Sequence, residues 1–447
     1  MELQEKPNET IQTMPSKSFF IDVLPRDIGL ADCILDLVDN AIDSFVRHSN
    51  IDVMNILLEN SPSRVGAENS TASIIISFSE SSFSIKDTCG GITIQEAKDY
   101  VFKFGLPEEK TKTYSGRGLS VFGIGMKRAF FKIGRLIKLI SVAEGKEFQV
   151  TLDVNQWRKS AEWDLKFDYI KEAEKGSPAG TFVSIETLND GIGARFQLEH
   201  FKNQLINRIR SAYTLFLMKG IKIEVNGEEI RSILPKISMS EELSFVRKTL
   251  KFDGVDILIV AGLTPPDDKI PRGWYVFCNG RMVLEGDKTD LTGWGDNMPL
   301  FHSKYNHFLG YVYFRSDDVT ILPWTTTKYG IEKESVVYQF ALQEMQIQAK
   351  PITNFLGKKY PGDILAEGIF EKKIHESAKA IPLDELPKQE TVFVIHKKPR
   401  GEYKVINIAY KKPRDLFEKV KNCIGRAGIS AKEVGEYTFD YFVNKEC

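Results

Sequence analysis

The sequence lacks a charge excess, a cysteine framework and a long apolar run. Its 447 residues include 60 Lys and Arg against 61 Asp and Glu, a formal net charge of -1. This balance excludes a globally basic nucleic-acid binder and a disordered polyelectrolyte. The five cysteines form no closely spaced pair, so free thiols in a reducing cytosol are favoured over disulfides or a zinc site. A membrane span needs about 20 consecutive apolar residues, and the longest apolar run, 255–263, is interrupted by Asp256.

The length of the chain predicts several domains. At about 100–200 residues each, two to four are expected. The polar amino terminus has no secretory signal pattern, so we expect a cytoplasmic protein with no membrane partner. Shifts in composition predict an N-terminal arm (1–17), a first domain (18–235), a second domain (236–362), a linker (363–390) and a small basic module (391–447).

Hydrophobic periodicity predicts both strands and helices in these domains. Alternation predicts strands at 72–78, 82–86, 136–142, 147–154, 181–187, 255–261, 273–277 and 310–314, and helical spacing predicts helices at 196–219 and 336–355. In the last module we expect strands at 392–396 and 403–410, followed by two short helices. The expected fold class is therefore α+β.

The segment 30–45 predicts an amphipathic helix with an unusual polar face. At about 100° per residue, Asp36, Asp39, Asn40 and Asp43 fall within an arc of about 100° opposite the apolar side. Carboxylates crowded on one helix face repel each other unless something cationic lies there. A divalent metal with water ligands, or a water awaiting deprotonation, would suit this face. The alternative is the solvated acidic face of an ordinary helix.

A predicted strand ends at Asp87 and is followed by the glycine pair Gly90 and Gly91. Glycines allow a backbone to approach a flat ligand closely. A buried carboxylate at a strand end can accept a hydrogen bond from an exocyclic amine such as that of adenine. The alternative is a plain turn with Asp as its first residue.

Residues 116–127 form a glycine-rich stretch that leads into a predicted helix. Free N–H groups at a helix start can face phosphate oxygens, and Lys127 can add a positive charge. The stretch matches neither a Walker A loop nor Gly-x-Gly-x-x-Gly, so alone it is weak evidence. A Gly-Thr pair, Gly180 and Thr181, opens a later strand and means little by itself.

In this order and spacing, these four elements closely resemble the GHKL superfamily of ATPases (gyrase B, the ninety-kilodalton heat-shock chaperone, histidine kinases, MutL and MORC). The pattern is most similar to prokaryotic MORC/MutL-like ATP-binding proteins, and the resemblance covers residues of about 17–220. Residues 39–43 resemble the N box of that family, and residues 123–127 its second glycine box. Asp87 and Gly91 match its adenine-binding Asp and turn Gly, although many members have Asp-x-Gly-x-Gly there.

The resemblance implies a GHKL (Bergerat) α/β sandwich ATPase domain, then an S5-like α/β transducer domain and a small C-terminal α+β module. It implies ATP and Mg²⁺ as cofactors, Asn40 as the magnesium ligand, and residues 105–125 as a lid over the nucleotide. The implied ATP-binding residues are Asn40, Asp43, Asp87, Gly91, Ile92, Arg117, Gly118, Gly123, Ile124, Gly125, Met126, Lys127 and Thr181.

Two further residues would be catalytic by this resemblance. Asp36 stands where the family usually has the Glu that activates water. It is one methylene shorter, and a displacement of about 1 Å can cost on the order of 10²-fold in rate, so slow ATP hydrolysis is expected. Lys328, in the polar loop 321–331, resembles the basic residue that the second domain sends to the terminal phosphate. The alternative is a surface lysine in a turn. The segment 279–281 resembles the Asn-Gly-Arg hairpin of that domain.

The implied function is an ATPase switch in which ATP drives N-terminal pairing into a homodimer that acts on DNA or a DNA-associated partner protein. Two alternatives remain open: a chaperone-like ATPase acting on protein clients, and an ATP-binding module with little hydrolysis. Basic residues at 396–400 and 411–414 flank the hairpin expected in the last module. They would suit a nucleic-acid backbone, or they are solvated loop ends.

Overall fold

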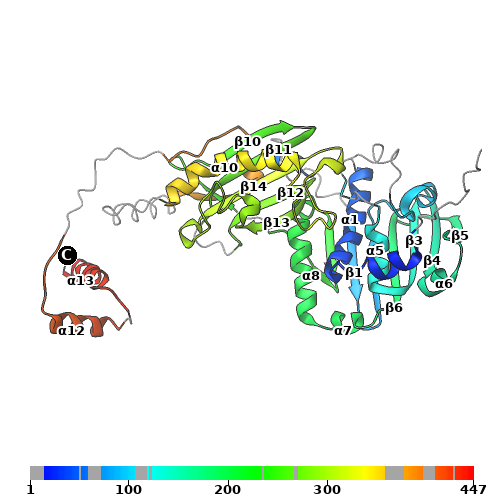
Figure 1. Ribbon diagram of the computed structural model, residues 1–447, viewed down its shortest axis with the longest axis horizontal. Coiled ribbons are helices and arrows are strands. Elements are labelled where there is room, and N and C mark those ends of the chain that lie inside the picture. The colour runs from blue at the N-terminus through cyan, green and yellow to red at the C-terminus, as the bar shows by residue number, and fades with distance from the viewer. Residues whose placement is uncertain are drawn as a thin grey trace, which may run out of the picture. The chain divides into compact units, whose positions relative to one another are not determined.

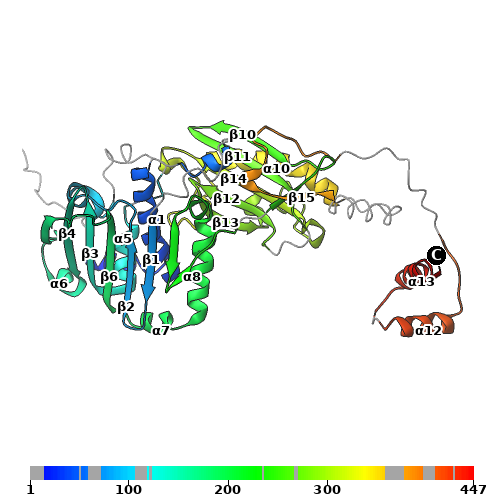
Figure 2. The same cartoon turned by 180° about the vertical axis from the view of Figure 1, so that it is seen from behind.

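The computed structural model describes residues 15–49, 52–58, 72–105, 118–119, 123–233, 236–265, 270–357, 377–395, 408–425 and 428–446 (Figures 1 and 2). The chain divides into two compact units, residues 1–397 and 398–447. Within the described ranges, no helix is long and apolar enough to span a bilayer. The expected α+β fold is confirmed, with large mixed sheets and helices.

An eight-stranded mixed sheet forms the first half of the larger unit, in the order β5-β4-β3-β6-β2-β1-β7-β8. Only the pair β1 and β7 among these is parallel. Side chains alternate between buried and exposed along β1 and β2, as expected when one face of a sheet is covered. The strands are β1 (Ser73–Phe78), β2 (Ser82–Asp87), β3 (Gly134–Ala143), β4 (Lys146–Asp153), β5 (Phe167–Glu172), β6 (Gly180–Leu188), β7 (Lys222–Val225) and β8 (Glu228–Glu229).

Helices cover one face of this sheet, with α1 (Leu30–Ser49), α5 (Gly125–Ile133) and α8 (Glu199–Ala212) in front of it in Figure 1 and behind it in Figure 2. Helix α1 is buried on nearly all sides, including Asp36, Asp39 and Asp43. Its acidic face is therefore not a solvated surface. Shorter helices are α2 (Asn55–Leu58), α3 (Ile94–Glu96), α6 (Val154–Lys159), α7 (Ile192–Phe196) and α9 (Thr214–Met218).

The single helix expected at 196–219 is two helices, α8 and α9, and its first residue, Phe196, ends α7. Leu198 has extended backbone angles, and Tyr213 leaves the helical conformation at the end of α8. The Tyr213 side chain is fully buried, and its hydroxyl donates to the Asp39 carboxylate. Apolar periodicity continues through such one-residue breaks, so the sequence pattern could not show them.

A five-stranded sheet forms the second half of the larger unit, in the order β10-β11-β14-β12-β13. The three strands expected here are confirmed as β11 (Val255–Leu263), β12 (Gly273–Cys278) and β14 (Phe308–Arg315). All six residues of β12 are buried, which explains why they read as a continuous apolar run. Helix α10 (Val336–Gly357) packs on β11 and β14. The strands β10 (Val246–Phe252) and β13 (Arg281–Asp287) were not expected, because they are rich in charged residues.

Part of the segment expected to be a linker folds back onto the larger unit. Strand β15 (Lys379–Pro382) pairs with β9 (Lys236–Met239), and Leu383 and Leu386 are buried. Further on, residues 391 and 395 form isolated bridges with Arg247 and Leu243. The described part of the strand expected at 392–396 therefore lies with the larger unit, where backbone pairing holds it. Most of its expected partner, residues 403–407, lies outside the described residues.

The smaller unit contains the two short helices expected there, α12 (Arg414–Ile424) and α13 (Ala431–Glu446). Several large apolar side chains of this unit are exposed, among them Leu416, Phe439 and Phe442. Cys423 is a free, exposed thiol, whereas Cys33, Cys89 and Cys278 of the larger unit are free and buried. Among the described cysteines, therefore, none forms a disulfide.

Candidate functional site

A deep cavity lies beside helix α1, where the two halves of the larger unit meet. The space between its walls is about 1370 Å³, a volume that includes open solvent at its mouth. The wall comes mainly from α1, α5 and the first sheet, and Thr326 and Lys328 of the second half complete it. It consists of Asp36, Leu37, Asn40, Ala41, Asp43, Ser44, Arg47, Ile85, Asp87, Ile92, Tyr100, Val101, Gly118, Gly123, Ile124, Gly125, Met126, Lys127, Arg128, Leu139, Thr181, Val183, Thr326 and Lys328.

The structure brings most of the expected site residues together around this cavity. Asp36 and Asn40 come from α1, Asp87 from the end of β2, and Thr181 from β6. Lys328 is far away in sequence, yet it reaches the same wall. The remaining expected residues on the wall are Asp43, Ile92, Gly118, Gly123, Ile124, Gly125, Met126 and Lys127.

Gly91 and Arg117 are not part of the described wall. Arg117 lies outside the described residues. Gly91 has a φ of 75°, and a Cβ atom there would lie 2.2 Å from the carbonyl oxygen of Val142. A Cβ atom at Gly180 would lie 2.1 Å from the carbonyl oxygen of Asp87. Both glycines therefore permit close backbone packing behind the wall.

One part of the wall, which we call the apolar end, combines the buried carboxylate of Asp87 with apolar side chains. Asp87 is 8% exposed, and its Oδ1 accepts a hydrogen bond from the backbone N–H of Cys89 at 2.9 Å. Burial raises the pKa of Asp87 to about 6, although backbone hydrogen bonds from Cys89 and Thr181 act in the opposite direction. Ile85, Ile92, Leu139 and Val183 belong to the same wall. A flat, apolar ligand with one amine donor would suit this end.

The start of helix α5 forms another part of the wall. Gly125 begins the helix, and a Cβ atom there would lie 3.2 Å from the Asp36 carboxyl carbon. The side chain of Lys127 is buried and donates to the carbonyl oxygen of Gly123 at 2.6 Å. Burial lowers the pKa of Lys127 to about 7. An anion near this helix start would be stabilised by free N–H groups and by the protonated lysine.

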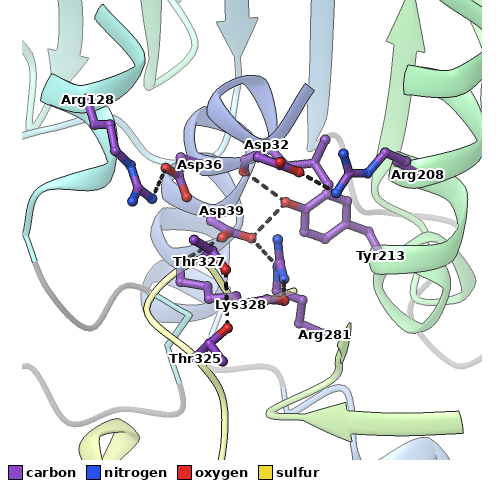
Figure 3. Close-up of polar contacts among 11 residues, drawn as sticks. Asp32, Asp36, Asp39, Arg128, Arg208, Tyr213, Arg281, Thr325, Thr327 and Lys328 are labelled. Carbon is purple, nitrogen blue, oxygen red and sulfur yellow. Dashed lines mark hydrogen bonds and ion pairs between the residues drawn. The ribbon is translucent and has the colours of Figure 1, made fainter. Parts of the chain in front are cut away.

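Asp36 forms a buried ion pair with the residue after Lys127 (Figure 3). Its Oδ2 accepts a hydrogen bond from Nη2 of Arg128 at 2.7 Å. Nε of Arg128 is buried and has no partner within the described part of the chain. Burial raises the pKa of Asp36, while the charges of Lys328 and Arg128 oppose that rise. Asp36, the expected general base, is thus paired with Arg128, whose Nε–H could still donate a hydrogen bond to a ligand.

Asp39 holds the loop of Lys328 against helix α1 (Figure 3). Nζ of Lys328 donates to Oδ2 of Asp39 at 2.7 Å, and Nε of Arg281 donates to Oδ1 at 2.9 Å. The Tyr213 hydroxyl also donates to Oδ1, at 2.7 Å. Burial alone would raise the pKa of Asp39, but Arg281 and Lys328 bring it below its usual value. An ionised carboxylate therefore joins the two halves of the unit.

The loop expected to act as a lid also contacts both halves where it is described. The backbone N–H of Leu119 donates to Oδ1 of Asp43. Nδ2 of Asn279, in the hairpin of the second half, donates to the carbonyl oxygen of Gly118 at 3.3 Å. Residues 118–119 are therefore held between α1 and the second sheet.

Sequence reasoning missed several residues of this site. Ser44 and Arg47 lie four and seven positions after Asn40, so helical spacing could have placed them on the same face. Arg128 directly follows Lys127, but nothing local indicates that its side chain reaches Asp36. Tyr100 and Thr326 line the cavity without any sequence signal that we can identify.

Residues 28–181 match the model of a family described as histidine kinase-, DNA gyrase B-, and HSP90-like ATPase. The match supports a GHKL-type ATPase domain. It spans the elements that carry Asp36, Asn40, Asp87 and Lys127, and it ends at Thr181. A GHKL-type domain suggests ATP binding and hydrolysis. A search of curated proteins found no match for the chain.

The residues of the GHKL-type cavity fit magnesium only together with a phosphate ligand. Among the described residues, no group of three or more His, Cys, Asp or Glu could hold a metal ion. Mg²⁺ is commonly bound through one or two protein oxygens together with substrate phosphates and water. Asn40 lies on the cavity wall, and a side-chain amide oxygen suits that mode.

Proposed function

We propose that this chain is a Mg²⁺-dependent ATPase that couples the terminal phosphate of ATP to the contact between its two halves. The observation that carries the proposal is the division of charge within one cavity. Asp87 lies at the apolar end, where no charged side chain of the described residues acts on it. Arg128 and Lys328 both act on Asp36, and we call this part of the wall, together with Lys127 at the start of α5, the charged end. An amine-bearing base linked to several phosphates matches both ends at once.

Each residue has a role in this proposal. The Asp87 carboxylate accepts a hydrogen bond from the adenine amine, which selects adenine. The start of α5 and Lys127 bind phosphate oxygens. Asn40 would hold the magnesium ion, which neutralises phosphate charge when bound. Lys328 approaches the terminal phosphate from the second half and neutralises the charge that develops there.

Asp36 would act as the general base. Its carboxylate is on the cavity wall beside Gly125, at the start of α5. A carboxylate whose pKa burial raises is a better proton acceptor for water than an ordinary surface Asp. Asp36 would take the proton of the attacking water, and Arg128 would keep the carboxylate oriented meanwhile.

Titration calorimetry with ATP and Mg²⁺, together with phosphate release, tests this proposal. The wild-type chain should bind ATP and release phosphate. Asn40→Ala should lose Mg²⁺-dependent binding, because no other described residue is assigned to the metal. Absence of heat in the wild type, or unchanged Mg²⁺-dependent affinity in Asn40→Ala, would contradict the assignment.

The Asp36–Arg128 pair favours a second candidate, an ATP-binding module with little hydrolysis. A carboxylate that accepts a hydrogen bond from a buried guanidinium 2.7 Å away is less free to accept a proton from water. In that case ATP would act as a structural ligand. Binding of ATP without phosphate release above the Asp36→Ala background would establish this version.

At a finer level, we propose a MORC/MutL-like cycle in which ATP pairs two copies through their GHKL-type domains to act on DNA. The exposed residues Lys411, Lys412 and Arg414 of the smaller unit support a contact with phosphates. Retention on DNA at about 50 mM salt that is lost as salt rises would support this client. A lack of retention would favour protein clients, and light scattering with ATP would test the pairing.

A further inference from the structure

One buried carboxylate, Asp39 of the first half, forms ion pairs with two cations of the second half. Asp39, Arg281 and Lys328 are 0%, 0% and 6% exposed, so this ion cluster is shielded from water. The two ion pairs measure 2.9 Å to Arg281 and 2.7 Å to Lys328. Asp39 lies directly before the residue assigned to magnesium, yet it is not on the cavity wall. Its role is therefore different from that of its neighbour.

Lys328 is held in an unusual backbone conformation. Its φ of 59° lies in the left-handed region, which a lysine rarely adopts. The backbone N–H of Lys328 donates to the carbonyl oxygen of Thr325 at 2.8 Å. Nη1 of Arg281 donates to the carbonyl oxygen of Lys328. Arg281 thus binds the main chain of Lys328, while Asp39 binds its side chain.

The charges of the cluster do not balance without an outside anion. Asp39 faces two cations, Arg281 and Lys328, and Nη2 of Arg281 is buried with no partner among the described residues. Asp36 is paired with Arg128 and also interacts with the charge of Lys328, so two carboxylates, Asp36 and Asp39, face three cations. Buried charge is costly unless paired, so the excess positive charge near Lys328 favours arrival of an anion in the cavity.

We propose that Asp39 is the positioning residue for Lys328: it holds the lysine ammonium beside the cavity until the terminal phosphate of the nucleotide replaces it as the partner. The inference rests on the proposed function, because it takes that phosphate as the competing anion. Arg281 keeps Asp39 paired after the exchange, so the carboxylate is never left alone. The loop of Lys328 then moves with its ammonium, and the second half responds to ATP but not to ADP.

The test is the preference for ATP over ADP, measured by calorimetry on the full chain with Mg²⁺. In the wild type, ATP must break the contact between Asp39 and Lys328, whereas ADP leaves it in place. Asp39→Asn removes that competition, so its ATP-to-ADP affinity ratio should rise about tenfold, roughly the effect of one hydrogen bond to a charged group. In the double variant Asp39→Asn with Lys328→Met, the increase should disappear.

A matched control is the surface pair of Lys333 and Asp290, joined at 2.6 Å with Asp290 largely exposed. Asp290→Asn also removes an Asp–Lys pair, but it should leave the affinity ratio unchanged. An affinity ratio in Asp39→Asn equal to or below that of a wild type that binds ATP would overturn the inference and leave the proposed function standing. A wild type that binds neither nucleotide would overturn the proposed function, and the inference with it.

A second variant decides the matter if Asp39→Asn does not fold. Lys328→Met removes the same contact from the other side, while Asp39 keeps its pair with Arg281. Without nucleotide, its thermal unfolding midpoint should fall by about 5 °C, because a buried ionic partner is lost. ATP should restore little of that loss, since the variant lacks the Lys328 ammonium that the terminal phosphate would contact. A wild-type midpoint in Lys328→Met would show that the contact does not hold the halves together.

Discussion

The two ends of the cavity differ in how a buried Asp carboxylate is surrounded. At the apolar end, Asp87 has backbone N–H donors, no cation among the described residues acts on it, and burial raises its pKa to about 6. Beside the charged end, Asp39, which is not on the cavity wall, is even more buried, yet two cations hold its pKa below the usual value. The comparison teaches that burial alone does not set the protonation state of a carboxylate. The charged and hydrogen-bonding groups buried beside it decide that state.

The same contrast separates local from long-range construction. Asp87 and its hydrogen-bond partner Cys89 are two residues apart. Asp39 and Lys328 are 289 residues apart, and Asp39 and Arg281 are 242 apart. The surroundings of Asp87 are therefore built within the first half, whereas the ion cluster around Asp39 forms only when the second half docks.

The largest expected effect concerns the charged end. Asp36→Asn should lower the rate of ATP hydrolysis by about 10²–10⁴-fold, the usual contribution of a general base, with ATP affinity changed only a few-fold. Phosphate release and calorimetry measure the two quantities. The control is Asp32→Asn, since Asp32 lies on the same helix but pairs with Arg208 and is not on the cavity wall. Wild-type turnover in Asp36→Asn would place the base elsewhere.

At the apolar end, Asp87→Asn should weaken binding of ATP and ADP alike, by about 10–100-fold, because one hydrogen bond to a charged acceptor is lost. Equal losses for both nucleotides are the signature of the adenine end, since ADP and ATP share the base. Calorimetry with each nucleotide measures them. A loss confined to ATP would mean that Asp87 faces phosphate, and the assignment of the two ends would be reversed.

The pH dependence of adenosine binding should sharpen the comparison further. Adenine needs the ionised Asp87, so adenosine affinity should fall by up to about tenfold per pH unit below 6. The Asp87 contribution to the stability of the folded chain has the opposite pH dependence. Because folding raises this pKa from 3.8 to about 6, the folded chain binds the extra proton, and the Asp87 contribution to the free energy of unfolding decreases as pH rises from about 4 to 6. A pH-independent affinity for adenosine would contradict this reading.

The smallest expected effect is a decrease in ATP affinity at alkaline pH, which we call the alkaline limb. The affinity for adenosine should not show it. Burial lowers the pKa of Lys127 to about 7, so above that pH the nucleotide-free chain loses the positive charge that phosphate prefers. ATP affinity should then decrease a few-fold per pH unit, with a proton taken up on binding. Lys127→Gln should remove this limb and keep the acidic one. An alkaline limb that persists in Lys127→Gln would assign it to another group.

Sequence patterns predicted the fold class, most strands of both sheets and most of the cavity wall. The strands were predictable because alternation is a local signal, whereas most of the wall residues were implied by the resemblance to the GHKL superfamily. Ser44 and Arg47 were within reach of the same spacing argument. The charged strands β10 and β13 escaped it, because their polar residues hide the alternation. The strand β15 escaped it too, since only its pairing with β9 makes that segment extended.

The sequence by itself determined which chemical groups stand on which element: carboxylates and Asn40 on α1, Asp87 at the end of β2, and glycines before α5. Tertiary structure alone decided which charges meet. Arg128 reaches Asp36, and Tyr213, Arg281 and Lys328 converge on Asp39. The physical reason is that ion pairing depends on distance and burial in the folded chain, and residues hundreds of positions apart leave no periodic trace of a contact.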